Sequence, residues 1–290
     1  MPDLAQEESS TFKGLRPRSL IVTIYGLYAR EAGGWLSVST LIKMMAAFGI
    51  EPQAVRSSIA RLKRREILDA TKLGGAAGYA LSPHGREILQ RGDRRIFERP
   101  RATTADGWVL VVFTGIPESE REKRYQLRAS LSWLGFGTVA NGVWIAPAHV
   151  ADEARNVLRD SNLTEYVDLF RVDHFAFQSL AGNVATWWDI AELDRMYGEF
   201  VGLYRPTVTQ WRRLRRYDDA AAFVDYVEVL THWRRLPYLD PGLPAELLPR
   251  EWSGSQAADM FFELSRRLAP AARRYAKLVA GTEIAKVDSP

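Results

Sequence analysis

Apolar side chains recur every three or four residues through the first part of the chain, as they do on one face of a helix. This spacing predicts a helix over residues 17–30 and a second helix whose apolar stripe ends at Phe48. Ser39 is the expected N-cap of the second helix, because a serine oxygen can accept a hydrogen bond from a first-turn amide. Gly49 is its expected stop, since glycine readily takes the left-handed conformation that ends many helices. A short strand is expected between the two helices, over residues 35–37.

A third helix is predicted over residues 52–65, after a short turn that contains a glycine. Two helices joined this tightly form the helix-turn-helix pattern. Val55, Ile59 and Leu62 lie on the side of the third helix that should face a core. The opposite side and its flanks carry the polar and basic residues, which are Gln53, Arg56, Ser57, Arg61, Lys63, Arg64 and Arg65.

Between positions 53 and 65 the third helix carries five cations and no acidic residue. Cations can neutralise DNA phosphates, and arginine or glutamine can read base edges in the major groove. Gln53 and Ser57 lie near the helix start, where recognition helices usually contact bases. The formal net charge is +4 for the whole chain, but residues 1–100 hold 16 Lys and Arg against 10 Asp and Glu. Such charge asymmetry between segments is a further, weaker indication of nucleic-acid contact.

A β-hairpin is predicted directly after the third helix, with strands over residues 67–72 and 79–81 and a glycine-rich tip over 74–78. Lys72 is the hairpin residue expected to contact a phosphate beside the minor groove. A fourth helix is expected over residues 83–95. This order of elements predicts a winged helix-turn-helix. A basic amphipathic helix alone is more often simply a solvated surface, so the interpretation depends on the complete order.

The middle of the chain alternates strands and helices in the order β-α-β-β-α-β, which is the ferredoxin-like pattern. The strands are expected at 108–116, 136–140, 143–146 and 167–172, and the helices at 118–134 and 148–160. Asn141 and Gly142 predict a tight hairpin, because both central residues of that turn need a positive φ. Residues 135–140 also match a dinucleotide-binding fingerprint, but that fingerprint needs a strand before it and a helix after it, and here a helix precedes and a hairpin follows.

The last third of the chain is predicted to be mainly helical, with a proline-rich break at 237–244. A basic cluster at the end of one helix is either a solvated helix end or an anion site for a phosphate-bearing effector, because guanidinium groups match phosphate geometry. The cluster consists of Arg212, Arg213, Arg215 and Arg216. The fold expected is therefore a multidomain α+β protein, with a disordered lead-in at 1–16, a winged helix-turn-helix domain at 17–99, a ferredoxin-like domain at 106–178 and a helical C-terminal domain at 184–282.

Several segments, in the right order, resemble the PaaX family of repressors, which is named for phenylacetic acid degradation. They are PRSLIVTIYG and AVRSSIARLKRREIL near the start, WVLVVFTGIP at 108–117, LGFGTVANGVWIAP at 134–147, WWDIAELDRMYGEF at 187–200 and LDPGLPAELLPREWSG at 239–254. The resemblance implies a dimeric repressor of an aromatic catabolic operon. Because a two-fold symmetric dimer binds two related half-sites, we expect the operator DNA to be palindromic. The resemblance also implies release of that DNA by an acyl-CoA effector such as phenylacetyl-CoA.

The chain is expected not to be an enzyme, and no cofactor is expected. The middle segment also resembles the ferredoxin-like fold of CRISPR-associated spacer-acquisition nucleases, but residues 108–117 contain no carboxylate to hold a metal, and Asp106 precedes the strand. No paired metal-ligand spacing is present among the four histidines, which are His84, His149, His174 and His232.

The sequence contains no cysteine, no apolar run approaching the length of a membrane span, and no secretory signal at its start. These features lead us to expect a cytoplasmic protein. One alternative stays open, in which the winged helix binds protein or RNA instead of operator DNA, because a fold alone does not fix a function.

Overall fold

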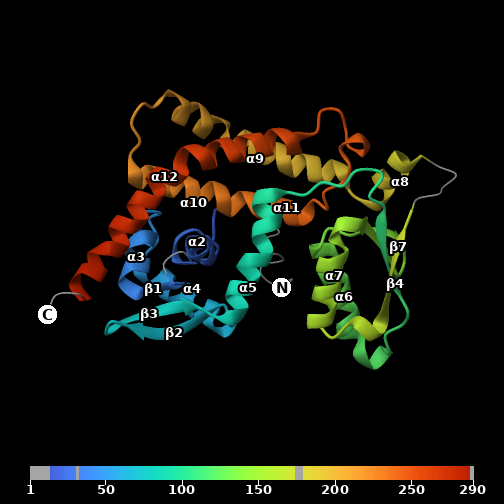
Figure 1. Ribbon diagram of the computed structural model, residues 1–290, viewed down its shortest axis with the longest axis horizontal. Helices are drawn as coiled ribbons and strands as arrows, with labels where there is room; N and C mark the ends of the chain where they lie inside the picture. The colour runs from blue at the N-terminus through green and yellow to red at the C-terminus, as the bar shows by residue number, and fades with distance from the viewer. Residues whose placement is uncertain (1–13, 31–32, 174–178, 288–290) are drawn as a thin grey trace. The chain divides into compact units, whose positions relative to one another are not determined.

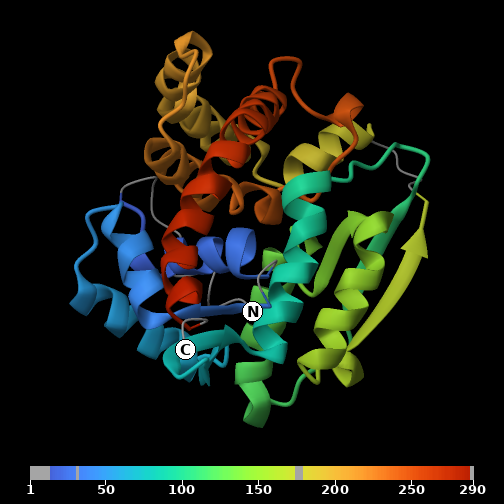
Figure 2. The same cartoon turned by 60° about the vertical axis from the view of Figure 1, so that its left-hand side comes forward.

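The computed structural model describes three stretches of the chain: residues 14–30, 33–173 and 179–287 (Figures 1 and 2). They form two compact units. The N-terminal unit comprises the described parts of Phe12–Asp93, Phe200–Trp233 and Gln256–Pro290. The central unit comprises the described parts of Arg94–Glu199 and Arg234–Ser255. The helices predicted over 184–282 are therefore divided between the two units.

Helices and a three-stranded sheet form the first part of the N-terminal unit. In chain order they are α2 (Pro17–Ile24) with its π-helical continuation η1 (Tyr25–Ala29), β1 (Trp35–Ser37), α3 (Val38–Ala46), α4 (Pro52–Arg64), β2 (Leu68–Leu73), β3 (Ala76–Leu81) and α5 (Pro83–Asp93). The sheet has the order β1-β3-β2, and both pairings are antiparallel. The chain thus has the succession of elements that the hydrophobic pattern predicts for this segment.

Local hydrogen bonds set the ends of α3 and α4. Ser37, and not Ser39 as predicted, caps α3: its Oγ accepts a hydrogen bond from the Thr40 amide at 2.9 Å, because the helix begins as soon as β1 ends. Gly49 follows α3 with a φ of 68°, as expected for a helix stop. The residue after the C-cap of α4 takes the same left-handed conformation, but it is Glu66, with a φ of 55°. A side chain therefore occupies a position that favours glycine.

The tip of the β2–β3 hairpin is tighter than the sequence predicts. The turn consists only of Gly74 and Gly75, with φ values of 55° and 79°, and β3 begins at Ala76. Gly78, which was expected in the tip, lies inside β3. A Cβ at this position would come within 2.5 Å of the backbone oxygen of Leu36 on β1. The glycines of this run therefore have two uses, a tight turn and a close approach between strands.

α2 lies at the centre of the N-terminal unit, where every residue from Arg18 to Ile24 is buried. It contacts α3 and α4 on one part of its surface and α10 (Asp219–Trp233) on another (Figure 1). The hydroxyl oxygens of Thr23 and Thr231 are 2.8 Å apart at the contact with α10. The rings of Trp233 and Phe261 are stacked with their centroids 4.7 Å apart, which joins α10 to α12 (Ser253–Val287). Segments far apart in the sequence therefore share one core.

The central unit is built around a four-stranded sheet. Its elements are η3 (Arg94–Glu98), β4 (Trp108–Phe113), η4 (Glu118–Glu120), α6 (Arg121–Trp133), β5 (Gly137–Ala140), β6 (Val143–Pro147), η5 (Ala148–Val150), α7 (Ala151–Asp160), η6 (Thr164–Tyr166), β7 (Val167–Val172), α8 (Leu180–Trp187), the first part of α9 (Ile190–Arg213), α11 (Leu236–Leu239) and η7 (Ala245–Leu247). The strand order is β5-β6-β4-β7, and all neighbours are antiparallel. This topology confirms the predicted ferredoxin-like fold, although β4 ends at Phe113 and not at residue 116.

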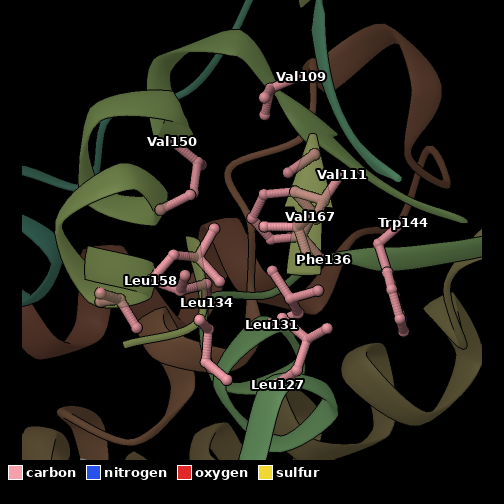
Figure 3. Packing of buried hydrophobic residues seen from close by; sticks show 14 of the residues in the cluster. Val109, Val111, Leu127, Leu131, Leu134, Phe136, Trp144, Val150, Leu158 and Val167 are labelled. Atoms are coloured by element: carbon pink, nitrogen blue, oxygen red, sulfur yellow. The ribbon is translucent and has the colours of Figure 1, made fainter. Parts of the chain in front are cut away.

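Helices α6 and α7 cover one face of this sheet. Figure 3 shows Val111 of β4 and Val167 of β7 beside Leu131 of α6 and Leu158 of α7, all buried in one apolar cluster. The alternation of apolar residues along the strands places these side chains on the helix-covered face. The packing of α6 and α7 leaves their outer sides open to solvent.

The other face of the sheet is covered by α8 and by Trp188, the residue that follows it. A Cβ on Gly137 would lie 2.6 Å from the Trp188 ring, and the Trp188 indole donates a hydrogen bond to the Gly135 carbonyl at 2.8 Å. These contacts give the glycines of the fingerprint-like stretch a role in packing. Within the described ranges, no helix combines the length and apolar character needed to span a bilayer.

Candidate nucleic-acid interface

α4 has one buried face and one open face. Val55, Ile59 and Leu62 are buried, as the spacing predicts, and Ser58 is buried beside them. Through this face α4 packs against α2, α3 and β2. Arg65 is the C-cap of α4 and is half-buried, at the edge of the open face. The exposed residues predicted for the open face are Gln53, Arg56, Ser57, Arg61, Lys63 and Arg64.

The cations of this open face have no carboxylate partner in the part of the chain that the structure describes. The side chains of Arg56, Arg61, Lys63 and Arg64 make no hydrogen bond or ion pair there. The first turn of α4 contains no acidic residue and its last turn contains three basic ones. The helix dipole favours positive charge at that end. The face is therefore suited to a polyanion, which would supply the missing negative charge.

The β2–β3 hairpin presents Lys72 close to its tip, with the side chain exposed. Leu73 follows it and is 60% exposed. The sequence interpretation did not single out Leu73, although an apolar residue directly before a glycine turn was a visible signal. Away from the tip, the Tyr25 hydroxyl donates a hydrogen bond to the Tyr79 carbonyl at 2.9 Å and anchors β3 to the first helix. The hairpin is thus fixed near its base and narrow at its tip.

The basic cluster predicted at the end of α9 contains one arginine that is already paired. The Nε of Arg212 donates to a Glu263 carboxylate oxygen on α12 at 2.8 Å. The Arg212 guanidinium, together with Arg267, holds the pKa of the Glu263 carboxyl at about 2, below its ordinary value of 4.5. Arg215 and Arg216 follow the end of α9 and are exposed. Arg212 is therefore already paired, whereas Arg213, Arg215 and Arg216 make no hydrogen bond or ion pair within the described residues.

An open groove of about 550 Å³ lies along α9 beside Arg213. Its lining residues are Arg205, Pro206, Thr209, Gln210, Arg213 and Leu214. Arg205, which the sequence interpretation missed, lies two helical turns before Arg213 and so on the same side of the helix. The groove combines two guanidinium groups with the apolar surface of Pro206 and Leu214. A role for this region in effector binding stays a prediction.

Asp106, the carboxylate that precedes the first strand of the sheet, is engaged in a turn. It lies before β4 and accepts a hydrogen bond from the Thr103 amide at 2.6 Å, which lowers the pKa of its carboxyl. Across residues 14–30, 33–173 and 179–287, no three or more metal-ligating side chains come together.

The histidines are scattered. His84 is exposed, and the Nδ1 of His232 lies 2.5 Å from the hydroxyl of Tyr204. His149 is half-buried, and burial together with the Arg95 charge lowers the pKa of its imidazole. His174 lies outside the described residues. The three histidines that the structure describes therefore have separate surroundings.

The two units described here, one of helices with a three-stranded sheet and one with a ferredoxin-like sheet, are matched by three family models. The model for a PaaX-like protein matches residues 16–85, that for the PaaX protein central Cas2-like domain matches 101–184, and that for the PaaX-like protein C-terminal domain matches 188–278. The chain belongs to the PaaX family.

One relative is the transcriptional repressor PaaX of Escherichia coli (strain K12). It is 25% identical over 276 residues, which are 94% of this chain and 86% of the relative. Among solved structures, the uncharacterized protein Rv0674 from Mycobacterium tuberculosis is similar with a TM-score of 0.60 and 22% identity, over 91% of this chain and 100% of that one. At this level of identity the solved structure supports the fold alone.

Proposed function

We propose that this chain is a transcriptional repressor whose residues 17–99 form a winged helix-turn-helix that binds operator DNA. The observation that carries the proposal is the open face of α4. Its exposed cations have no carboxylate partner among the described residues, and they are Arg56, Arg61, Lys63 and Arg64. The name of the E. coli relative, a transcriptional repressor, supports the same class of function. A protein that binds operator DNA works where that DNA is accessible, so we place this protein in the cytoplasm.

In this proposal α4, with its 13 residues, is the recognition helix. A helix rises by about 1.5 Å per residue, so α4 is about 20 Å long. The major groove of B-DNA is about 12 Å wide and admits a helix of this kind. Gln53 and Ser57, near the start of α4, are assigned to base edges, and Arg61 to a guanine. The phosphate contacts are assigned to the remaining basic residues, which are Arg56, Lys63, Arg64 and Arg65.

The hairpin and a second copy of the chain complete the proposed interface. Lys72 contacts a phosphate beside the minor groove. Two copies related by a two-fold axis bind the two halves of a palindromic operator, with half-sites about 34 Å apart or a multiple of that distance. The operator sequence can be found by selecting bound duplexes from a random pool.

Titration of the selected operator at several salt concentrations tests the proposal. Affinity should fall steeply with salt, with a slope of about −0.9 per neutralised phosphate. The Arg61→Ala, Arg64→Ala double variant should bind the operator about ten- to a hundredfold more weakly, because it loses one base contact and one phosphate contact. The matched control is Arg159→Ala, Arg266→Ala, which removes two exposed cations from α7 and α12 and should bind as the wild type does.

Near-wild-type operator binding by the Arg61→Ala, Arg64→Ala variant would refute the assignment of α4. Absence of any salt-dependent duplex binding by the wild type would favour the alternative, in which the N-terminal unit binds protein or RNA.

We further propose that an acyl-CoA effector, phenylacetyl-CoA by family resemblance, releases the DNA. The effector must bind the DNA-incompetent state better than the competent one. Its phosphates are assigned to the basic region of Arg205, Arg212, Arg213, Arg215 and Arg216, where Arg213 borders the groove on α9. Operator titrations with phenylacetyl-CoA, free phenylacetate and unrelated acyl thioesters test this. Identical operator affinity in all of them would eliminate the effector.

A further inference from the structure

A second row of exposed residues with basic character lies on α6, in the central unit. Arg121, Tyr125 and Arg128 occupy positions i, i+4 and i+7, so they share one side of the helix. All three are exposed, and Tyr125 has 69% of its surface open. The inner side of the same helix places Leu127 and Leu131 in the core. We call Arg121, Tyr125 and Arg128 the α6 row.

The side chains of the α6 row take no part in holding the fold together. Within the described ranges none of the three makes a hydrogen bond, an ion pair or a ring contact. Lys123, on the same helix, behaves differently: its Nζ lies 2.6 Å from the Tyr166 hydroxyl and 3.3 Å from a Glu120 carboxylate oxygen. The charges of the row are therefore available to a partner outside the described chain, whereas that of Lys123 is not.

Two other arginines of the central unit are packed or paired. Arg95 is buried, 2.8 Å from Glu153, and its guanidinium lies over the ring of Trp133. Arg155, on the outer side of α7, lies 3.6 Å from Asp152. These two arginines are held by other side chains, whereas Arg121 and Arg128 share one exposed side of α6 and have no partner among the described residues.

We propose that the α6 row binds the phosphate backbone of duplex DNA, as a contact separate from α4. Guanidinium groups form strong hydrogen bonds with phosphate oxygens, and tyrosine hydroxyls also donate to the DNA backbone. Arg121 and Arg128 are about 10 Å apart along the helix axis, so each contacts a phosphate of its own. Such a contact adds affinity without reading sequence. The proposal rests on the proposed function, which supplies duplex DNA as the partner.

The experiment uses the full chain with Arg121→Gln and Arg128→Gln together. The slope of log affinity against log salt should become shallower by about 1.8, because two phosphates contribute about 0.9 each. The change should be the same for the operator and for unrelated duplexes. The matched control, Arg155→Gln with Arg159→Gln, removes the same formal charge from α7 and should keep the wild-type slope. All four arginines are exposed, so thermal melting should confirm that every variant is folded.

The outcomes separate this proposal from the proposed function. If the wild type binds DNA with a salt-dependent affinity but both double variants have the wild-type slope, the α6 row is not a DNA contact and the role of α4 is unaffected. If the wild type shows no salt-dependent DNA binding, the proposed function is wrong, and this inference is wrong with it.

Tyr125 gives a second readout. Tyr125→Phe should weaken duplex binding about two- to tenfold if the hydroxyl donates to a phosphate, in line with a single hydrogen bond. If the row variant loses affinity for single-stranded DNA alone while duplex binding is unchanged, the partner is a single strand that stacks on the ring, and the duplex assignment is wrong.

Discussion

Two runs of arginine, one on α4 and one at the end of α9, look alike along the sequence but differ in what faces them. The cations on the open face of α4 have no carboxylate partner in the described chain. At the end of α9, Arg212 is held by Glu263, which lies 51 residues later on α12. The number of cations in a run therefore does not tell how many can bind a partner, because a carboxylate on a distant helix can pair with one of them.

The two runs should also respond differently to an anion. A phosphate that approaches α4 meets guanidinium groups with no internal competitor, whereas one that approaches Arg212 must displace or share Glu263. Exposed ion pairs are individually weak, so Glu263 should weaken the binding of a phosphate to Arg212 without preventing it. The following predictions test whether this difference governs the behaviour of the two regions.

The largest effect is expected from the buried side of α4. Leu62 is 1% exposed. Leu62→Ala should therefore lower the free energy of unfolding by about 2–5 kcal/mol through lost burial and a cavity, and urea denaturation measures this change. Arg61 lies one residue earlier, on the open face. The free energy of unfolding of Arg61→Ala should therefore stay within about 0.5 kcal/mol of the wild-type value. Equal stability losses from the two variants would show that α4 has no distinct inner and outer faces.

The next largest effect concerns DNA affinity. Arg61→Ala should weaken operator binding by about 1–3 kcal/mol and relax the base preference at one position, as expected for an arginine that reads guanine. Lys63→Ala should weaken binding to all duplexes alike and reduce the salt slope by about 1. Fluorescence anisotropy with the operator and single-base variants distinguishes the two. If both substitutions act alike on every sequence, Arg61 contacts a phosphate.

A smaller, stabilising effect is expected at the end of α4, where Glu66 is exposed and left-handed. Glu66→Gly should raise the free energy of unfolding by up to about 1 kcal/mol, since glycine avoids the steric cost of that conformation. Asn162 has the same role after α7, with a φ of 53°. Asn162→Gly should raise the free energy of unfolding by less than Glu66→Gly does, because asparagine tolerates the left-handed conformation better than glutamate. A lower melting temperature for Glu66→Gly than for the wild type would show that the left-handed conformation of Glu66 costs no stability.

The smallest effect belongs to the pair at the end of α9. The pKa of Glu263 is lowered to about 2 from 4.5. The stabilisation by its charge is therefore fully present above the ordinary pKa and is lost as the pH falls towards the lowered one. Glu263→Gln should melt slightly below the wild type at neutral pH, and the difference should shrink as the pH falls through this range. A difference in melting temperature that is independent of pH would mean that the charge of Glu263 contributes nothing.

The sequence predicted α4 and the central sheet well because their signals are local or follow a simple order. Spacing alone predicts the buried face of α4 from Val55, Ile59 and Leu62, and Gly49 predicts the turn before it. The β-α-β-β-α-β succession is compatible with few antiparallel topologies, so it also predicted the sheet. The role of these residues in binding DNA stays a prediction, since the fold does not test it.

The remaining features depend on contacts that spacing does not encode. The start of α3 depends on where β1 stops pairing with β3, where Ser37 faces Gly78, and this moves the cap from Ser39 to Ser37. A glycine in a turn and a glycine that must make room for another strand look the same in a sequence, so the hairpin tip was placed too broadly. The pairing of Arg212 with Glu263 joins different helices, and no local pattern reveals it.

The contact between Thr23 and Thr231 joins positions 208 residues apart, and it has a consequence for protein synthesis. At about 5–20 residues per second, the ribosome takes roughly 10–40 s to make the chain between them. During that time α2 has emerged but α10, which covers part of it, does not yet exist. A nascent chain therefore carries the residues of α4 without the finished support beneath them, and the proposed DNA-binding surface matures only when translation is nearly complete.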